Sequence, residues 1–403
     1  MKQVLVVLEG VLTEAVSAFG ERTALHTARL NHVERLASRG CQGVVLAPGG
    51  TVAMPAAQLL GHLAGVAPAT VSTLSRAGLE AVAQPHFDPS EKRQAWRATL
   101  VTESPHKVAE LNPALSLEET VAFGETLGES GIPGGGRLDA IGPGNFILSL
   151  PEAAGHPDVA SDPGTCPGWT LDDPLVPRWF GRSKDWSQPY TAWSRSALAG
   201  HPINEVRVDL GEDPAHRLWL WGGGPVRGEL DALAIPGLPK KTDRIAVFGS
   251  CPLARGFARS IGGGSYSIRH PFDEEGSGPV IRVPDMVEAL RLHDVVIVWI
   301  SATGPGGQYA DAAQTVRALE ALDQHVVGPL QDVLAAYRPA RGTLIAVEAQ
   351  APGESIRLSG RMPLLQWGDG LRSDQLGTWH EDTADSGRLG EIPIDAFLKV
   401  VWS

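Results

Sequence analysis

The glycine-rich turn GPGG at residues 304–307 is the first stretch whose residue types could do chemistry. It follows an apolar run at residues 294–300 and precedes a long helical pattern. In such a layout the backbone N–H groups at the helix start can hold a phosphate. The turn lacks the Lys-Ser/Thr pair of a P-loop and the G-x-G-x-x-G spacing of a dinucleotide site. We therefore favour a plain connection between a strand and a helix.

Cys251 is a second candidate, in the stretch FGSCPLARG at residues 248–256. Ser250 and Pro252 are typical of the start of a helix, and a helix N-terminus lowers the pKa of a thiol. Cys251 could then act as a nucleophile beside a suitable base, but a small residue in a tight turn explains it more simply. Arg255, one turn further on, could meet an anionic ligand, although a solvated arginine is the more frequent outcome.

Three polar residues in the stretch GHPINEVR could bind a carboxylate or a phosphate: His201, Asn204 and Arg207. The start of a capped helix explains the same pattern equally well. Arg76 and Glu80 lie four residues apart on a predicted helix, which predicts an ion pair between them. The glycine triplet at residues 222–224 predicts either unusual backbone angles or a close approach of another segment.

A metal site for phosphoryl chemistry would need clustered aspartates and histidines at the ends of parallel strands, with a serine or threonine nucleophile. At its predicted strand ends the chain offers Glu9, Gly304, Gln308, Glu348 and Ala349. Two carboxylates without a histidine make a poor site for a transition metal. The strand ends therefore predict no metal cofactor.

The overall composition is that of a folded protein: 403 residues, 43% apolar and 20% charged, with a net charge of −12. No run of Lys and Arg exceeds two residues, which argues against a nucleic-acid partner. The three cysteines are widely spaced, so neither a disulfide framework nor a zinc site is expected. The apolar run at the N-terminus is too short to span a membrane, and we expect a cytoplasmic protein. Nothing indicates an oligomeric state or a partner protein.

Short, uninterrupted apolar runs predict strands that are covered on both faces, as in a parallel sheet. These runs lie at residues 4–8, 43–46, 244–248, 294–300 and 343–347. Each is next to a helical pattern, and the clearest pattern, at residues 312–337, has one apolar stripe. Alternating strands and helices predict an α/β fold with a doubly wound, mostly parallel sheet.

The middle of the chain differs from its two ends. Between residues 131 and 239, Pro, Gly and Trp cluster and few long periodic segments remain. The simplest architecture is a core made from residues 1–85 and 241–403, with a smaller, loop-rich α+β domain inserted at residues 86–240. No internal repeat is present at the periods of solenoid proteins.

Several segments resemble, in order, those of the cofactor-independent (2,3-bisphosphoglycerate-independent) phosphoglycerate mutases of the archaeal type. That family belongs to the alkaline phosphatase superfamily, in which a metalloenzyme core carries an inserted domain. The segments are ERTALHTARLNHVERLASRGCQG, LAGVAPATVSTLSRAGLEAVAQ, GHPINEVRV, LWLWGGG, ARGFARSIGG and the stretch at residues 292–330. The resemblance therefore implies this fold, and by extension an isomerase of glycolysis.

The departures from the family fall on its metal site. The family's first-strand Asp-Gly is Glu9 followed by glycine here, and its D-E-A-G-H loop becomes a segment with Gly304 and Gln308 at the two ligand positions. Its D-H-x-T-P becomes a segment that starts with Glu348 and Ala349. A downstream ligand histidine is absent from SIRLSGRMPLL. The resemblance thus implies a metal site that has lost most of its ligands.

The family's nucleophilic serine lies opposite GGTVAMPAAQ, where Thr51 alone could replace it. Positions that match the family outside the metal site are Arg76, His201, Asn204, Arg207 and Arg255, and these could bind a small phosphorylated acid. They could equally hold the two domains together.

Three functions follow from these observations. The first is a catalytically inactive mutase-like protein with a binding or regulatory role. The second is an active mutase that interconverts 2- and 3-phosphoglycerate, with Thr51 carrying the phosphate and Glu9 and Glu348 holding one Mn²⁺, Mg²⁺ or Zn²⁺ ion. The third is a metal-free enzyme that uses Cys251. We favour the first, because the members of one catalytic site act as a unit and most of them are replaced.

Overall fold

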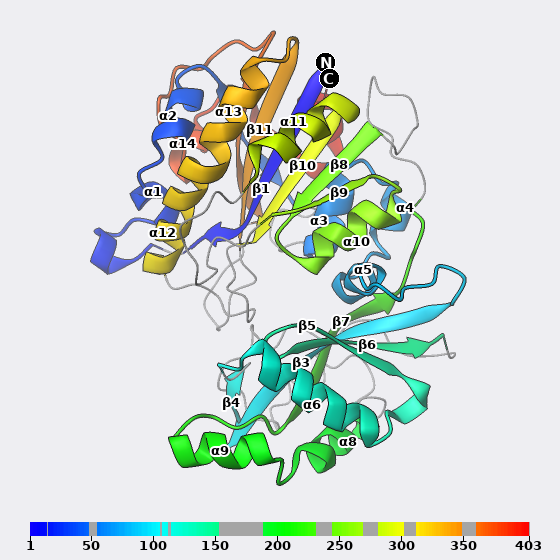
Figure 1. Ribbon diagram of the computed structural model, residues 1–403. Helices are drawn as coiled ribbons and strands as arrows, with labels where there is room; N and C mark the ends of the chain where they lie inside the picture. Colours follow the sequence, from blue (N-terminus) through cyan, green and yellow to red (C-terminus); the bar gives the residue numbers. More distant parts are fainter. Residues whose placement is uncertain are drawn as a thin grey trace.

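The computed structural model describes residues 1–13, 15–47, 55–104, 107–111, 114–152, 188–230, 244–268, 281–301, 312–348 and 360–402. These residues form two β-sheets, and the larger one holds both ends of the chain (Figure 1). The ends lie together, since the Gln3 side-chain amide donates to the carbonyl of Trp402 at 3.0 Å. No helix in these ranges is long and apolar enough to cross a membrane.

The larger sheet has the strand order β13-β2-β12-β11-β1-β10-β8-β9. Its strands are β1 (Lys2–Leu12), β2 (Cys41–Leu46), β8 (Ile245–Gly249), β9 (Gly264–Ser267), β10 (Val295–Ser301), β11 (Ala340–Glu348), β12 (Arg361–Gly368) and β13 (Gly390–Pro393). All neighbours pair in parallel except β12, which is antiparallel to both β11 and β2. The expected α/β fold with a mostly parallel sheet is confirmed.

Helices cover both faces of this sheet because successive residues of its strands point in opposite directions. In β1, Val4, Val6 and Leu8 belong to one buried cluster, and Leu5 and Val7 belong to the other. The first face packs against α2 (Asn31–Ala37), α11 (Val283–Leu292), α12 (Ala312–Leu322) and α13 (Gly328–Ala335). The second packs against α3 (Ala56–Leu63), α5 (Arg76–Val82), α10 (Pro252–Ser260) and α15 (Phe397–Val401).

The long helix expected at residues 312–337 is confirmed, with one irregularity. A π-helical turn, Asp323–Val327, joins α12 to α13. The buried carboxylate of Asp323 accepts hydrogen bonds from the backbone N–H groups of His32 and Val33 at 2.8–3.1 Å. Because these N–H groups belong to the first turn of α2, the carboxylate satisfies donors that the helix itself leaves free.

The smaller sheet is antiparallel and comes from the middle of the chain. Its strands are β3 (Arg93–Ser104), β4 (Lys107–Leu111), β5 (Arg137–Gly142), β6 (Asn145–Pro151) and β7 (Arg217–Pro225). One face is covered by α6 (Leu117–Glu129), α8 (Gln188–Leu198) and α9 (Pro202–Leu210). The described part of this region is thus more regular than its loop-rich composition suggested. The domain boundaries at residues 85/86 and 240/241 stay predictions.

The two sheets meet at α5, which packs against β3 and β7 of the smaller sheet and against α10 of the core (Figure 1). The prediction for the glycine triplet is confirmed here. Gly222 has a φ of +61°, a Cβ on Gly223 would lie 2.2 Å from the Trp96 ring, and one on Gly224 would lie 2.6 Å from Ser75 at the start of α5. Gly223 therefore lets β7 approach Trp96 of β3 closely, and Gly224 lets it approach the start of α5.

Candidate functional site at the junction of the two sheets

Glu9 lies near the carboxyl end of β1, between Ser301 of β10 and Val347 of β11. In a parallel sheet this is the edge where ligands usually bind. Both oxygens of its carboxylate have partners: the Trp299 indole N–H donates to Oε2 at 2.9 Å, and Nη1 of Arg76 lies 3.5 Å from Oε1. The side chain is only 12% exposed, so these contacts are largely shielded from water.

Arg76 also binds Glu80, as the sequence predicted: its Nε lies 3.1 Å from Glu80 Oε1. The Glu80 side chain is fully buried, and Nε of Arg97 lies 3.7 Å from its second oxygen. A buried carboxylate needs such partners because leaving it unpaired costs several kcal/mol (of order 3–5 when one partner is removed). Ser75 caps α5 by accepting a hydrogen bond from the Gly78 N–H, which fixes where Arg76 starts.

Trp221 of β7 lies against both arginines. The guanidinium of Arg97 is 5.1 Å, and that of Arg76 is 6.0 Å, from the indole ring centre, within the range of cation–π attraction. The Trp221 indole N–H donates to Thr99 Oγ1 at 2.9 Å. Two carboxylates and two guanidiniums, on Glu9, Arg76, Glu80 and Arg97, thus form a compact group with no formal net charge, which we call the charge cluster.

Cys251 is the N-cap residue of α10, beside the charge cluster. The expectation that the helix start lowers its pKa is wrong. Burial, with the negative charge of Glu9 adding to it, raises the pKa of the Cys251 thiol to about 11. Desolvation of a thiolate therefore outweighs the helix dipole and the positive charge of Arg76. A nucleophilic role for Cys251 has no support from this environment.

Comparisons with known proteins identify the relatives of this chain. No protein-family model matches it. A 2,3-bisphosphoglycerate-independent phosphoglycerate mutase of Methanothrix thermoacetophila is 26% identical over 410 residues, which span 100% of this chain and 99% of the relative. The mutase of Methanosarcina mazei is 22% identical, with 100% and 99% covered. This chain is a relative of the 2,3-bisphosphoglycerate-independent phosphoglycerate mutases.

Solved structures agree on the fold of the phosphoglycerate mutase relatives. A structure from Pyrococcus horikoshii superimposes with a TM-score of 0.69 at 20% identity, covering 99% of this chain and 96% of that one. The cofactor-independent phosphoglycerate mutase of Thermoplasma acidophilum gives 0.52 at 17% identity, with 100% and 99% covered. The resemblance seen in the sequence is confirmed for the fold.

The contacts of Glu9 do not favour the metal pair implied by the mutase family. Glu9, at the family's first aspartate position, already has both oxygens engaged, and the guanidinium of Arg76 would repel a cation there. Gly304 and Ala349 have no side-chain ligand atom, and with Thr51 and Gln308 they lie outside the described residues. Glu348 ends β11, opposite Leu12 of β1. Divalent cations need a set of fixed, negatively charged ligands, and Glu9 is already paired with a cationic side chain.

Arg255 is half-buried in the first turns of α10. It forms no hydrogen bond and no ion pair with the part of the chain that the structure describes. Of the two arginines expected to meet an anion near the core, Arg76 has two carboxylate partners and Arg255 has none among these residues. Arg255 therefore stays the better candidate for an anionic ligand.

His201 and Asn204 lie in the smaller-sheet domain, away from the charge cluster. His201 is the N-cap of α9, where its Nδ1 accepts from the Ile203 N–H at 3.2 Å, as the capped-helix alternative predicted. The buried amide of Asn204 bonds the backbones of Leu198 and Ala215. Both side chains thus fix the path of the chain around α9.

Arg207 is 4% exposed and pairs with Glu119 at 2.9 Å and Glu212 at 3.1 Å. It also donates to the carbonyl of Asp213 at 2.8 Å. The described contacts of His201, Asn204 and Arg207 all lie within residues 86–240, so these three do not reach the core. The substrate contacts predicted for them have no support from these contacts. Of the residues that could hold the two domains together, Arg76 does contact both, through Glu9 and Trp221.

Sequence reasoning did not identify Arg97 or Trp299 as partners of the site. Trp299 lies in the apolar run at residues 294–300, which predicts a buried strand, but its indole N–H reaches Glu9 because β1 and β10 are neighbours. The missing information was the strand order. Once β10 is placed beside β1, a tryptophan near the end of one strand and a glutamate at the same edge of the other predict this hydrogen bond.

Proposed function

We propose that this chain keeps the fold of the phosphoglycerate mutases without their two-metal chemistry, and that it acts by binding a small phosphorylated acid. The observation that supports the loss of metal chemistry is the state of Glu9. Trp299 and Arg76 occupy both of its oxygens, at the strand end where the family places a metal ligand. A cation could use Glu9 only if Arg76 moved away.

That displacement is costly in physical terms. Arg76 is shared between Glu9 and the fully buried Glu80, and it lies over Trp221. Breaking a buried ion pair on one side costs on the order of 3–5 kcal/mol, because the remaining charge is left without compensation. The charge cluster is therefore a stable alternative to a metal site.

Arg255 is the residue that we propose to hold the phosphorylated acid. It is half-buried, its charge has no partner among the described residues, and it lies near the start of α10, where the helix dipole favours anions. A guanidinium suits a phosphate or carboxylate because it can donate two parallel hydrogen bonds.

Calorimetric titration with 3-phosphoglycerate tests this binding role. We expect saturable binding that weakens at least about tenfold in Arg255→Ala, which corresponds to about 1.4 kcal/mol. Arg39→Ala is the matched control, since Arg39 is exposed and lies two residues before β2, at the opposite edge of the sheet. Equal affinity in the wild type and Arg255→Ala, or no binding at all, would contradict the binding role.

An active phosphoglycerate mutase is the second candidate, and the full-length match to proteins of that name favours it. In this alternative Thr51 would carry the phosphate, and Glu9 and Glu348 would hold one Mn²⁺, Mg²⁺ or Zn²⁺ ion. The variant Thr51→Ala separates the candidates: any turnover of the wild type that disappears in this variant supports the mutase. Turnover that survives it excludes Thr51 as the nucleophile.

A further inference from the structure

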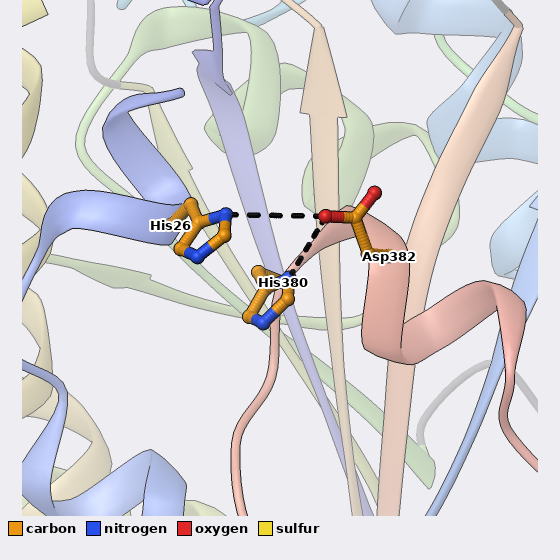
Figure 2. A group of neighbouring side chains, drawn as sticks. All are labelled: His26, His380 and Asp382. Atoms are coloured by element: carbon orange, nitrogen blue, oxygen red, sulfur yellow. Dashed lines mark ion pairs between the residues drawn. The ribbon is translucent and has the colours of Figure 1, made fainter. Parts of the chain in front are cut away.

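A group of three potential ligands lies outside the charge cluster. His26 belongs to α1 (Ala24–Thr27), and His380 and Asp382 belong to the start of α14 (Glu381–Asp385). Each offers one ligand atom, and these atoms all lie within 4.8 Å of one another. Figure 2 shows the two imidazoles side by side, with the carboxylate facing them from α14. Among the described residues this is the group whose donors suit a metal ion.

The two histidines face the same oxygen of the carboxylate. Nδ1 of His26 and Nδ1 of His380 are each 3.9 Å from the same oxygen, Oδ2 of Asp382 (Figure 2). The two rings are stacked, with centres 4.1 Å apart and planes 8° from parallel. A separation of 3.9 Å is too long for a hydrogen bond, so the three side chains face one another without bonding directly.

The backbone around the group is well anchored. Thr23 caps α1 by accepting a hydrogen bond from the His26 N–H, and its hydroxyl donates to Glu381 at 3.1 Å. The backbone N–H of His380 donates to the hydroxyl of Thr383 at 2.9 Å. Two segments from opposite ends of the sequence are thus fixed against each other, and they keep the backbones of the two histidines close together.

One buried ring nitrogen of His380, Nδ1, is unsatisfied. The His380 side chain faces the backbone N–H of Thr383 in the capping box of α14, but its buried Nδ1 forms no hydrogen bond. A buried ring nitrogen without a hydrogen-bond partner is uncommon and calls for an explanation. A bound metal ion that accepts the lone pair of this nitrogen would provide one.

We propose that His26, His380 and Asp382 form a site for a divalent cation of the zinc class. Two imidazoles and one carboxylate are the donors that such borderline cations prefer, and three protein ligands leave a fourth position open. Zinc–ligand distances of about 2.0–2.2 Å place neighbouring ligand atoms about 3.3 Å apart in a tetrahedron. The lone pair of an imidazole nitrogen lies in the ring plane, so the stacked rings must also rotate to share one ion. His26 is 32% exposed and Asp382 is 82% exposed, so both side chains have room to move toward such an ion.

The site would join the segment after β1 to the segment before β13, far apart in the sequence. An ion that binds only the folded chain raises the free energy of unfolding. The gain grows with the logarithm of the ion concentration once that concentration exceeds the dissociation constant. Zinc should therefore raise the midpoint of thermal unfolding. This inference is independent of the proposed loss of mutase chemistry, since none of the three residues lies at the family's metal positions.

Titration of the chelator-treated full-length protein with Zn²⁺ tests the proposal. We expect one tightly bound Zn²⁺ per chain, and Co²⁺ in its place should give the visible absorption of a low-symmetry, roughly tetrahedral site. His26→Gln, His380→Gln and Asp382→Asn should each weaken Zn²⁺ binding at least about tenfold and abolish the zinc-dependent rise in unfolding temperature.

Two variants serve as controls. His86 faces Asp139 at 3.2 Å without a third ligand among the described residues, so His86→Gln should leave zinc binding unchanged. Glu348→Gln tests the family's metal edge and should also leave it unchanged. Circular dichroism shows whether each variant is folded. Absence of zinc binding by the wild type, unchanged affinity in folded His26→Gln and His380→Gln, or loss of the ion in Glu348→Gln would overturn the proposal.

Discussion

Glu9 illustrates at the residue scale how one side chain can be held by two partners of different kinds. Trp299 offers a neutral donor, and Arg76 offers a charge that is also shared with Glu80. The carboxylate is therefore stabilised by the chain itself. Its contribution to folding can be measured because the neutral glutamine has nearly the same shape.

Glu9→Gln should lower the free energy of unfolding by about 1–3 kcal/mol, since it leaves the partly buried Arg76 without one of its two carboxylates. Urea denaturation measures the change. Glu34→Gln, at an exposed glutamate of α2, is the control and should stay within about 0.5 kcal/mol of the wild type. A Glu9→Gln protein as stable as the wild type would show that the cluster contributes little.

Cys251 gives a second prediction at this scale. With a pKa of about 11, its thiol is almost entirely protonated at pH 7.5 and should resist iodoacetamide in the folded protein. The rate of alkylation, followed site by site by mass spectrometry, should rise toward pH 11. Because the charge of Glu9 helps to raise this pKa, Glu9→Gln should shift the profile to lower pH. Fast labelling at pH 7 would contradict this account.

The packing of α5 against α10 is the critical contact at the scale of the elements. A Cβ on Gly256 of α10 would lie 1.7 Å from the carbonyl oxygen of Leu79 in α5, so a side chain there forces the two helices apart. Gly128 of α6 has no atom within 4 Å of the same position. The two glycines therefore serve different purposes.

Gly256→Ala should destabilise the protein by at least about 1–3 kcal/mol through overpacking. Gly128→Ala should instead stabilise it by up to about 1 kcal/mol, because alanine is the better helix former. Thermal unfolding of the two variants under identical conditions tests both signs. A Gly256→Ala protein as stable as the wild type would mean that α5 and α10 can move apart at little cost in free energy.

The cap of α9 predicts a dependence on pH. Burial lowers the pKa of His201, so the folded protein binds fewer protons than the unfolded chain below the unfolded value of about 6.5. Unfolding free energy should then fall as the pH drops from about 6.5 toward the lower folded pKa. The slope approaches about 1.4 kcal/mol per pH unit for each extra proton that unfolding takes up.

His201→Asn keeps a good capping residue and removes the titrating group. The free energy of unfolding of this variant should fall less between pH 7 and pH 5 than that of the wild type. His86→Asn, at a half-exposed histidine, is the control and should behave like the wild type. Denaturant midpoints at several pH values measure this. An unchanged slope would show that His201 takes up no additional proton on unfolding.

At the scale of the whole molecule, local sequence patterns predicted the main elements of the fold but not the contacts between them. Uninterrupted apolar runs predicted the parallel strands, and the stripe at residues 312–337 predicted the long helix, because both patterns depend only on local periodicity. The partners of Glu9 and the group around His26 and His380 could not be predicted. They depend on strand order and on contacts between distant segments, which periodicity does not encode.

Charge balance at the junction of the two sheets comes from side chains of the chain itself. The charge cluster compensates its carboxylates with guanidiniums from α5 and β3, so the core and the smaller sheet are tied together through Arg76, Glu80 and Arg97. We propose that the strand edge serves binding in place of phosphate transfer.

The interconversion of 2- and 3-phosphoglycerate in the presence of added Mn²⁺ tests this account most directly. Measured beside the Methanothrix thermoacetophila relative, the rate per chain should be at least about a thousandfold lower, since losing the members of one catalytic unit costs several powers of ten. The result that would contradict the account is turnover at a rate comparable to that of the relative, dependent on Mn²⁺ and abolished in Thr51→Ala.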